Sequence, residues 1–217
     1  MLKLADAVKY FRDHEGVVSH MYLDIVGLVT VGVGFLLRTS EDAVALKFLN
    51  RTTGKAATAD EKRRDWDPVS QQVKAKRANF YQKFTQLDLP VDQIDKRLEF
   101  LIVEFSNSLR SQFPGFDHFP TSAQIGLMDM IYSLGPGGFF RGYPKMCAAV
   151  ARADWMAAAS ECERGGVSPS RNTDCRQLFL DAAQVPSLLV PSAPSERSMT
   201  PTASPRESAR DWLTGSS

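Results

Sequence analysis

The sequence predicts an α+β fold that is mainly helical and contains one small antiparallel sheet near the N-terminus. Residues 17–37 carry β-branched and other apolar side chains between Gly27, Gly32 and Gly34, which is typical of short strands joined by tight turns. Apolar residues recur at helical spacing over most of residues 39–183. The chain has 217 residues, of which 43% are hydrophobic and 24% charged, enough for one domain in one or two lobes.

The N-terminal stretch MLKLADAVKYFRDHEG predicts an amphipathic helix. Leu4, Val8 and Phe11 lie at helical spacing, with charged residues between them. A secretory signal would need an uninterrupted apolar run of about 7–15 residues and a small-residue cleavage site. We therefore expect a protein made in the cytoplasm without a signal peptide, and no window of the chain is long enough to span a membrane.

Polar caps and prolines mark the expected starts of the next helices. Acidic residues follow the first caps, as suits the positive end of a helix. The expected starts are Thr39 or Ser40, the Thr58-x-x-Glu61 capping box, Pro68 and Pro90. Residues 91–113 then continue with apolar side chains at helical spacing.

The most apolar helix is expected at residues 123–134, where apolar side chains lie on nearly all faces and predict burial. It should stop at the run from Gly135 to Gly138. Further helices are expected at residues 143–151, 154–163 and 170–183. Residues 186–217 contain five prolines and many serines and threonines, so they predict a flexible tail behind a domain of residues 1–185.

Charge and cysteine content exclude several classes of protein. Lys and Arg total 26 against 25 Asp and Glu, and a net charge of +1 does not argue for nucleic acid. Three cysteines without Cys-x-x-Cys spacing indicate neither a disulfide framework nor a zinc site. We expect buried thiols, with a Cys147–Cys162 bridge as the alternative.

Two further residue sets have ordinary interpretations. The histidines, His14, His20 and His118, lack the Gly-x-Ser-x-Gly elbow of a hydrolase triad, so we expect ordinary surface or loop residues. The basic residues of segments 62–64 and 74–77 are interspersed with acidic ones, which predicts a solvated helix face. Contact with anionic wall polymers or nucleic acid is the alternative for that run.

Two carboxylates suggest acid–base chemistry. Glu15 is expected at the C-terminal end of the first helix, followed by Gly16 as its cap. The negative end of the helix dipole disfavours a second negative charge there, so the carboxyl should hold its proton to higher pH, as a general acid must. Asp24 is expected in a turn of the sheet, solvated and ionised, with the hydroxyl of Thr30 close enough to share a water molecule. Such an acid and base facing each other across a cleft could hydrolyse a glycoside, although a solvated surface pair is the alternative on these residues alone.

A longer pattern favours the catalytic interpretation. The string HEGVVSHMYLDIVGLVTVGVGFLL resembles the active-site segment of the phage-type lysozymes, the family of the T-even bacteriophage enzyme. In that pattern Glu-Gly, Asp, Thr and Gly-x-Gly follow one another at fixed spacing, and Glu15, Asp24, Thr30 and Gly32–Gly34 match without a gap. One departure is Phe35, which stands where the family commonly has His. If that His only braces the site, activity should survive the change.

Two later stretches support the resemblance. AQIGLMDMIYSLG looks like the buried central helix of the family's helical lobe, and SPSRNTDCRQLF resembles the region holding an Arg able to pair with the catalytic Glu. Arg171 is the first candidate for that Arg and Arg176 the second. The resemblance covers residues 5–37 and 119–183, while residues 54–116 diverge.

The resemblance implies a small lobe of residues 1–55 with a hairpin sheet and a helical lobe of residues 56–185. It implies a muramidase that cleaves the β-1,4 bond between N-acetylmuramic acid and N-acetylglucosamine, with inversion and with carboxyl groups about 6.5–9.5 Å apart. It implies no metal and no cofactor. Tyr22 and Tyr132 could stack on sugar faces, with ordinary packing as the alternative for each.

The expected setting is the bacterial cell wall in the periplasm. A lysozyme without a signal peptide fits a phage endolysin released through a holin pore, or a toxin injected by a secretion machine and neutralised by an immunity protein. We expect a monomer that binds peptidoglycan and not nucleic acid. Two alternatives stay open, which are a catalytically silent lysozyme scaffold that binds a partner and a related glycosidase acting on chitin or chitosan.

Overall fold

The computed structural model describes residues 3–185, with the backbone alone for residues 14 and 15. This part of the chain forms two compact units. The sheet unit comprises residues 17–94, and the helical unit comprises residues 3–16 together with 95–185. The predicted tail at 186–217 lies outside the described residues.

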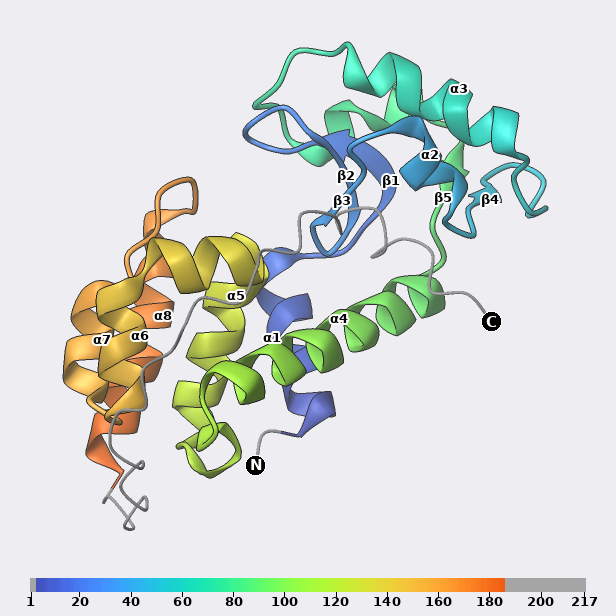
Figure 1. Cartoon of the computed structure of the whole chain (residues 1–217). Helices are drawn as coiled ribbons and strands as arrows, with labels where there is room; N and C mark the ends of the chain where they lie inside the picture. The colour runs from blue at the N-terminus through green and yellow to red at the C-terminus, as the bar shows by residue number, and fades with distance from the viewer. Residues whose placement is uncertain (1–2, 186–217) are drawn as a thin grey trace. The chain divides into compact units, whose positions relative to one another are not determined.

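The fold class is as predicted, mainly helical with a small antiparallel sheet (Figure 1). The first sheet has the order β1-β2-β3, formed by Val18–Leu23, Val29–Gly32 and Phe35–Leu36. A second sheet pairs β4 (Leu49–Asn50) with β5 (Leu87–Asp88). The sequence did not predict this second sheet, because strands of two residues are too short to show an alternating pattern.

The helices of the sheet unit begin at the predicted caps. Helix α2 (Ser40–Val44) starts after Thr39 and α3 (Ala59–Ser70) after Thr58, and each start is a capping box. Two short 3₁₀ turns, η1 (Ala78–Phe80) and η2 (Gln82–Phe84), follow. The prediction that Pro68 begins a new helix is wrong, because Pro68 lies in the last turn of α3, where the buried Val69 keeps that turn packed.

The boundary between the units differs from the predicted lobe boundary near residue 55. The sheet unit runs on to Ile94, because residues 58–89 are tied to the first sheet. The indole N–H of Trp66 donates to the carbonyl of Leu37 at 3.0 Å, and the N–H of Leu89 donates to the carbonyl of Ser19 at 2.8 Å. Helix α3 therefore packs with β1 and β2.

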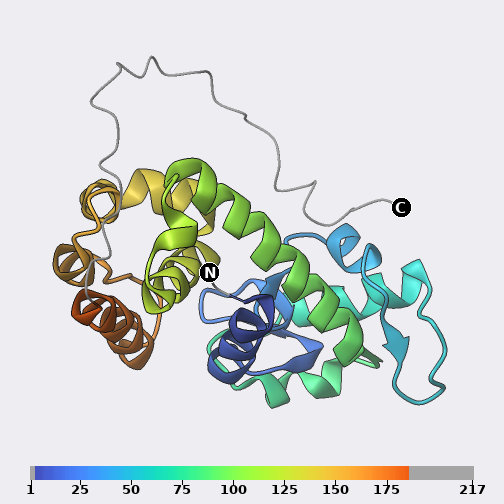
Figure 2. The same cartoon turned by 90° about the horizontal axis from the view of Figure 1, so that it is seen from below.

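The helical unit is built from α1, most of α4, the short 3₁₀ helix η3 and four later α-helices (Figures 1 and 2). Their bounds are α1 Leu4–Glu15, α4 Val91–Gln112, η3 Phe116–His118, α5 Thr121–Gly142, α6 Pro144–Ala151, α7 Trp155–Glu161 and α8 Pro169–Gln184. Helix α4 begins directly after Pro90, as predicted.

Helix α5 is the buried centre of this unit and packs against α8. As predicted, the helical path breaks at Gly135, whose φ of 68° lies in the left-handed region. A further helical stretch follows that break and runs to Gly142, which the sequence did not predict. Within the described chain, no helix is both long and apolar enough to cross a membrane.

Candidate active site

The predicted site residues fall into two groups, one in each unit. The sheet unit holds Tyr22, Asp24, Thr30 and Phe35, and the helical unit holds Glu15, Tyr132 and Arg171. The distance between the carboxyl groups of Glu15 and Asp24 stays a prediction.

Asp24 lies in the turn between β1 and β2, as predicted, and its carboxylate is fixed by the backbone of that turn. Its Oδ1 atom accepts hydrogen bonds from three successive N–H groups, those of Val26 at 3.0 Å, Gly27 at 2.8 Å and Leu28 at 2.8 Å. Such side-chain bonds to the following backbone are typical of turns that begin with Asp. Among the described groups none donates to Oδ2, so one oxygen orients the carboxylate and the other is left for a water or a ligand.

Thr30 is connected to Asp24 through a single backbone residue. Leu28 donates its N–H to Asp24 Oδ1, and its carbonyl accepts the hydroxyl of Thr30 at 3.1 Å. Thr30 is nearly fully buried in β2, opposite Tyr22 of β1. Because the Thr30 proton is committed to Leu28, its Oγ1 lone pairs are the part of the hydroxyl that can act on a water molecule.

Tyr22 and Phe35 lie on the two strands that pair with β2, Tyr22 on β1 and Phe35 on β3. Tyr22 is half-buried on β1. The Phe35 ring is buried over Gly32, whose φ is 71°, and a Cβ atom at Gly32 would lie 2.8 Å from that ring. Phe35 therefore supports the hairpin by packing, and Gly32 is required by this close approach.

Helix α1 ends at Glu15, as predicted, and Gly16 caps it with a φ of 69°. The helix is anchored four residues earlier by Phe11, which is fully buried. The Phe11 ring stacks on Tyr132 with centroids 4.3 Å apart, and Tyr132 meets Phe105 edge-on at 6.1 Å. These contacts favour the packing alternative for Tyr132.

Arg171 takes part in a buried ion cluster centred on Asp129. Arg171 binds Asp129 Oδ1 through Nε at 3.0 Å and Nη2 at 2.7 Å, while Arg164 Nη2 binds Oδ2 at 2.6 Å. The side chains of Arg164 and Asp129 are fully buried, and that of Arg171 is 15% exposed. Two guanidinium groups therefore bind the two oxygens of one carboxylate.

Neighbouring polar groups complete the cluster. Arg164 Nη1 donates to the carbonyl of Asp129 at 2.9 Å and to the hydroxyl of Ser133 at 2.7 Å, and Asn172 accepts from the backbone N–H of Arg164 at 3.1 Å. Burial, followed by the charge of Asp129, raises the pKa of Tyr10 on α1. The charge of Asp129 thus acts on a side chain of the helix that ends at Glu15. An ion pair between Arg171 and Glu15 stays a prediction.

Sequence reasoning missed Asp129 and Arg164. Asp129 could have been detected, because it is the only charged residue in the apolar stretch from Ala123 to Leu134. A carboxylate in a buried helix needs a cation as its partner. Nothing in the spacing pointed to Arg164 as one of those cations. Arg176, the second candidate for bracing the acid, is exposed on α8.

The cysteines and histidines show no catalytic arrangement in the described chain. Cys147, Cys162 and Cys175 are free and buried, so the alternative of a Cys147–Cys162 bridge is wrong, and the thiol of Cys162 donates to the carbonyl of Ala159 at 3.3 Å. The expectation of a surface or loop residue is wrong for His20, which is buried on β1 with Nε2 2.9 Å from the carbonyl of Ala78. Among the side chains that the structure describes, which exclude those of residues 14 and 15, no group of His, Cys, Asp or Glu is arranged to hold a metal ion.

The basic run divides into two parts. Lys62 donates to the carbonyl of Val44 at 2.8 Å, and Arg63 forms ion pairs with Glu41 and Asp60. The cations of residues 74–77 lie in an exposed loop after α3, so they are not on the predicted helix face.

A scan of protein-family models and a search of curated proteins give no match to this chain.

Proposed function

We propose that the protein is a muramidase that cleaves the β-1,4 bond between N-acetylmuramic acid and N-acetylglucosamine. The observation that carries the proposal is the Asp24 carboxylate, oriented through Oδ1 by three N–H groups and linked to Thr30 through Leu28. The sequence around it resembles the active-site segment of phage-type lysozymes. The end of α1 at Glu15 supports the same assignment.

In the proposed reaction, the protonated carboxyl of Glu15 gives its proton to the glycosidic oxygen as the bond to the anomeric carbon breaks. A water molecule donates hydrogen bonds to Asp24 Oδ2 and Thr30 Oγ1, and its oxygen attacks the anomeric carbon from the opposite face. Asp24 takes the proton that the water loses. The product is a reducing end with inverted configuration, and Arg171 would brace the acid.

The substrate class and setting follow from the same resemblance. Peptidoglycan is the proposed polymer, reached in the periplasm by an injected effector or by a phage endolysin. An effector would have an immunity protein as its partner. No metal and no cofactor take part in the proposed steps.

The test is the release of reducing ends from purified peptidoglycan, followed by mass analysis of the fragments. Glu15→Gln should lower the rate by about 10²–10⁴-fold, the usual contribution of a general acid. Asp24→Asn should lower it comparably while keeping an oxygen for the three turn N–H groups. The matched control is Glu99→Gln, which changes an exposed side chain on α4 and should keep the wild-type rate.

The outcomes separate this proposal from its alternatives. Wild-type rates in Glu15→Gln would remove the assigned chemistry. Binding of peptidoglycan without new reducing ends would indicate a silent scaffold. Hydrolysis of chitin or chitosan in preference to peptidoglycan would assign a different substrate to the same residues.

A further inference from the structure

The tip of the β1–β2 hairpin exposes aliphatic side chains. Ile25 is 69% exposed and Val26 60%, and Leu28 follows at 38%. Val73, in the loop that follows α3, is 66% exposed. Side chains with such high exposure project from the surface, and no acid–base role in the proposed reaction uses them.

The loop of residues 71–77 lies directly beside the hairpin tip. A Cβ atom placed on Gly27 would lie 3.3 Å from Lys74 Cδ and 3.5 Å from its Cβ. Figure 1 shows the two loops at the same end of the sheet unit. The four aliphatic side chains and the cations of residues 74–77 therefore form one patch, which we call the tip patch.

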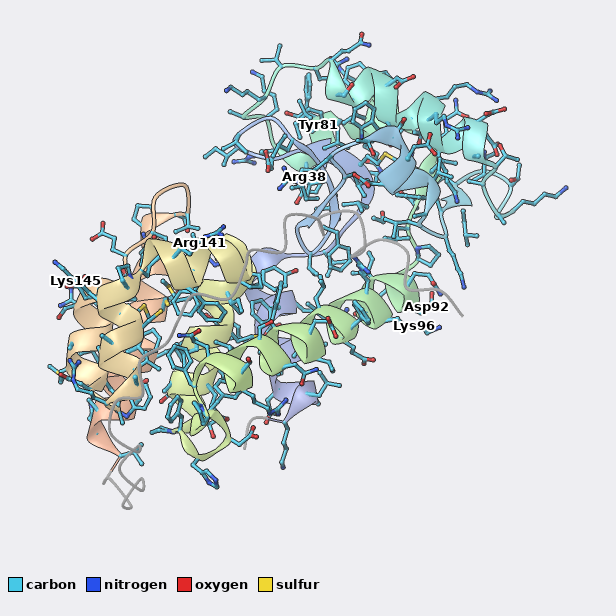
Figure 3. All side chains as sticks on the ribbon, in the orientation of Figure 1. Arg38, Tyr81, Asp92, Lys96, Arg141 and Lys145 are labelled. Carbon is cyan, nitrogen blue, oxygen red and sulfur yellow. The ribbon has the colours of Figure 1, made fainter. Side chains whose placement is uncertain are left out.

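Buried groups hold this loop in place. The hydroxyl of Tyr81, labelled in Figure 3, donates to the carbonyl of Val73 at 2.8 Å. His20 Nε2 lies 2.9 Å from the carbonyl of Ala78. Ala75, within this loop, has a φ of 60°, which is a strained conformation for a residue with a side chain. The arrangement of the tip patch is thus fixed by the fold.

The tip patch has an excess of positive charge. Lys74, Lys76 and Arg77 are exposed, and no carboxylate of the described residues forms an ion pair with them. Asp24 is the only acidic residue in segments 24–28 and 71–77, and its Oδ1 is occupied by backbone N–H groups. The patch therefore combines three cations with four projecting aliphatic side chains.

We propose that the tip patch binds the surface of a bilayer that contains anionic phospholipids. A soluble polyanion would be held by the cations but would leave the aliphatic side chains in water. A bilayer interface can take both, because projecting aliphatic groups enter the acyl boundary while Lys and Arg meet the phosphates. The proposal is independent of the proposed hydrolysis.

The test is co-sedimentation of the full chain with vesicles of phosphatidylglycerol, compared with vesicles of phosphatidylcholine. Lys74→Ala/Lys76→Ala should weaken binding to the anionic vesicles about 30-fold, since each cation near such a surface contributes about 1 kcal/mol. Ile25→Ser/Val26→Ser should weaken it at least about tenfold through lost apolar burial. Lys47→Ala/Lys55→Ala removes two exposed lysines elsewhere in the sheet unit and should change it less than about threefold.

Three results would overturn the proposal. Equal binding to both kinds of vesicle would remove the role of the anionic headgroup. Equal losses in the two lysine pairs would indicate a general charge effect. Wild-type binding by Ile25→Ser/Val26→Ser, with its circular dichroism spectrum unchanged, would show that cations alone make the contact, as for a soluble polyanion or an acidic protein. The vesicles contain no glycan, so none of these results depends on muramidase activity.

Discussion

Two buried carboxylates, Asp65 and Asp129, are stabilised in different ways. Asp65 on α3 accepts the N–H groups of Gln86 at 2.8 Å and Leu87 at 2.9 Å. Asp129 on α5 is neutralised by two guanidinium groups. The first carboxylate ties α3 to the start of β5, and the second ties α5 to α8 and the loop before it.

For Asp65, we expect the charge to oppose folding. Burial raises the pKa of Asp65 above its unfolded value, so its contribution to stability is fully present below the unfolded pKa and is lost as the pH rises through the folded pKa. Asp65→Asn keeps an acceptor oxygen and removes the buried charge, so the free energy of unfolding at pH 7 should be unchanged or raised. Asp65→Ala should lower it by about 1–3 kcal/mol for each N–H left unpaired.

Urea unfolding at a series of pH values measures this effect. The matched control is Asp67→Asn, an exposed carboxylate two residues along the same helix, which should change the free energy of unfolding at pH 7 by less than about 0.5 kcal/mol. A large loss of stability in Asp65→Asn at pH 7 would show that the ionised form is the stabilising one.

For Asp129, removal of the carboxylate should strongly destabilise the helical unit. Asp129→Ala leaves two guanidinium groups without their shared partner, and breaking a buried ion pair in this way costs about 3–5 kcal/mol. Asp13→Ala, which breaks an exposed pair with Lys9, should cost less than about 1 kcal/mol. Denaturant unfolding compares the two, and a cost below about 1 kcal/mol for Asp129→Ala would mean that the guanidinium charges are satisfied by other groups.

At the scale of elements, the packing of α5 on α8 depends on one glycine. A Cβ atom at Gly126 would lie 2.8 Å from the ring of Phe179, which is fully buried. Gly126→Ala should therefore lower the free energy of unfolding by about 1–3 kcal/mol through overpacking, despite the better helix propensity of Ala.

Gly142→Ala is the control in the same helix, because nothing lies within 4 Å of the added methyl group. This variant should be neutral or slightly more stable. Thermal unfolding of both variants measures the difference. Equal stability of the two would contradict the close contact between α5 and α8.

At the scale of the molecule, the helical unit is assembled from the two ends of the described chain. Helix α1 belongs to it through the stack of Phe11 on Tyr132 and through an ion pair of Arg12 with Asp95 at 3.2 Å. The sheet unit of residues 17–94 lies between these two parts in the sequence. The hydrogen bonds of Asp65 and Trp66 join residues within this unit.

This division predicts that the units respond differently to loss of α1. A chain that lacks residues 1–16 exposes the cavity left by Phe11, and loss of such a buried ring costs about 3–5 kcal/mol. Hydrogen exchange followed by mass spectrometry should show lost protection over residues 95–185 and retained protection over residues 17–94. Equal loss in both segments would show that the two units fold as one.

Features that depend on neighbouring residues were predictable from the sequence. The capping boxes at Thr39 and Thr58, the end of α1 at Glu15, the Asp24 turn and the break at Gly135 all involve groups within a few positions of each other. Local hydrogen bonds and backbone preferences act over that range, so a spacing pattern reveals them.

Contacts between residues distant in the sequence were not predictable in this way and became known from the fold. The pairing of β4 with β5, the attachment of residues 58–89 to the first sheet and the Asp129–Arg164–Arg171 cluster join residues far apart in the sequence. A short strand or a buried charge gains its partner through burial, which depends on how the whole chain packs and leaves no spacing to detect. For that reason the sequence could not pair Arg171 with Asp129, although Asp129 is the only charged residue in the apolar stretch from Ala123 to Leu134.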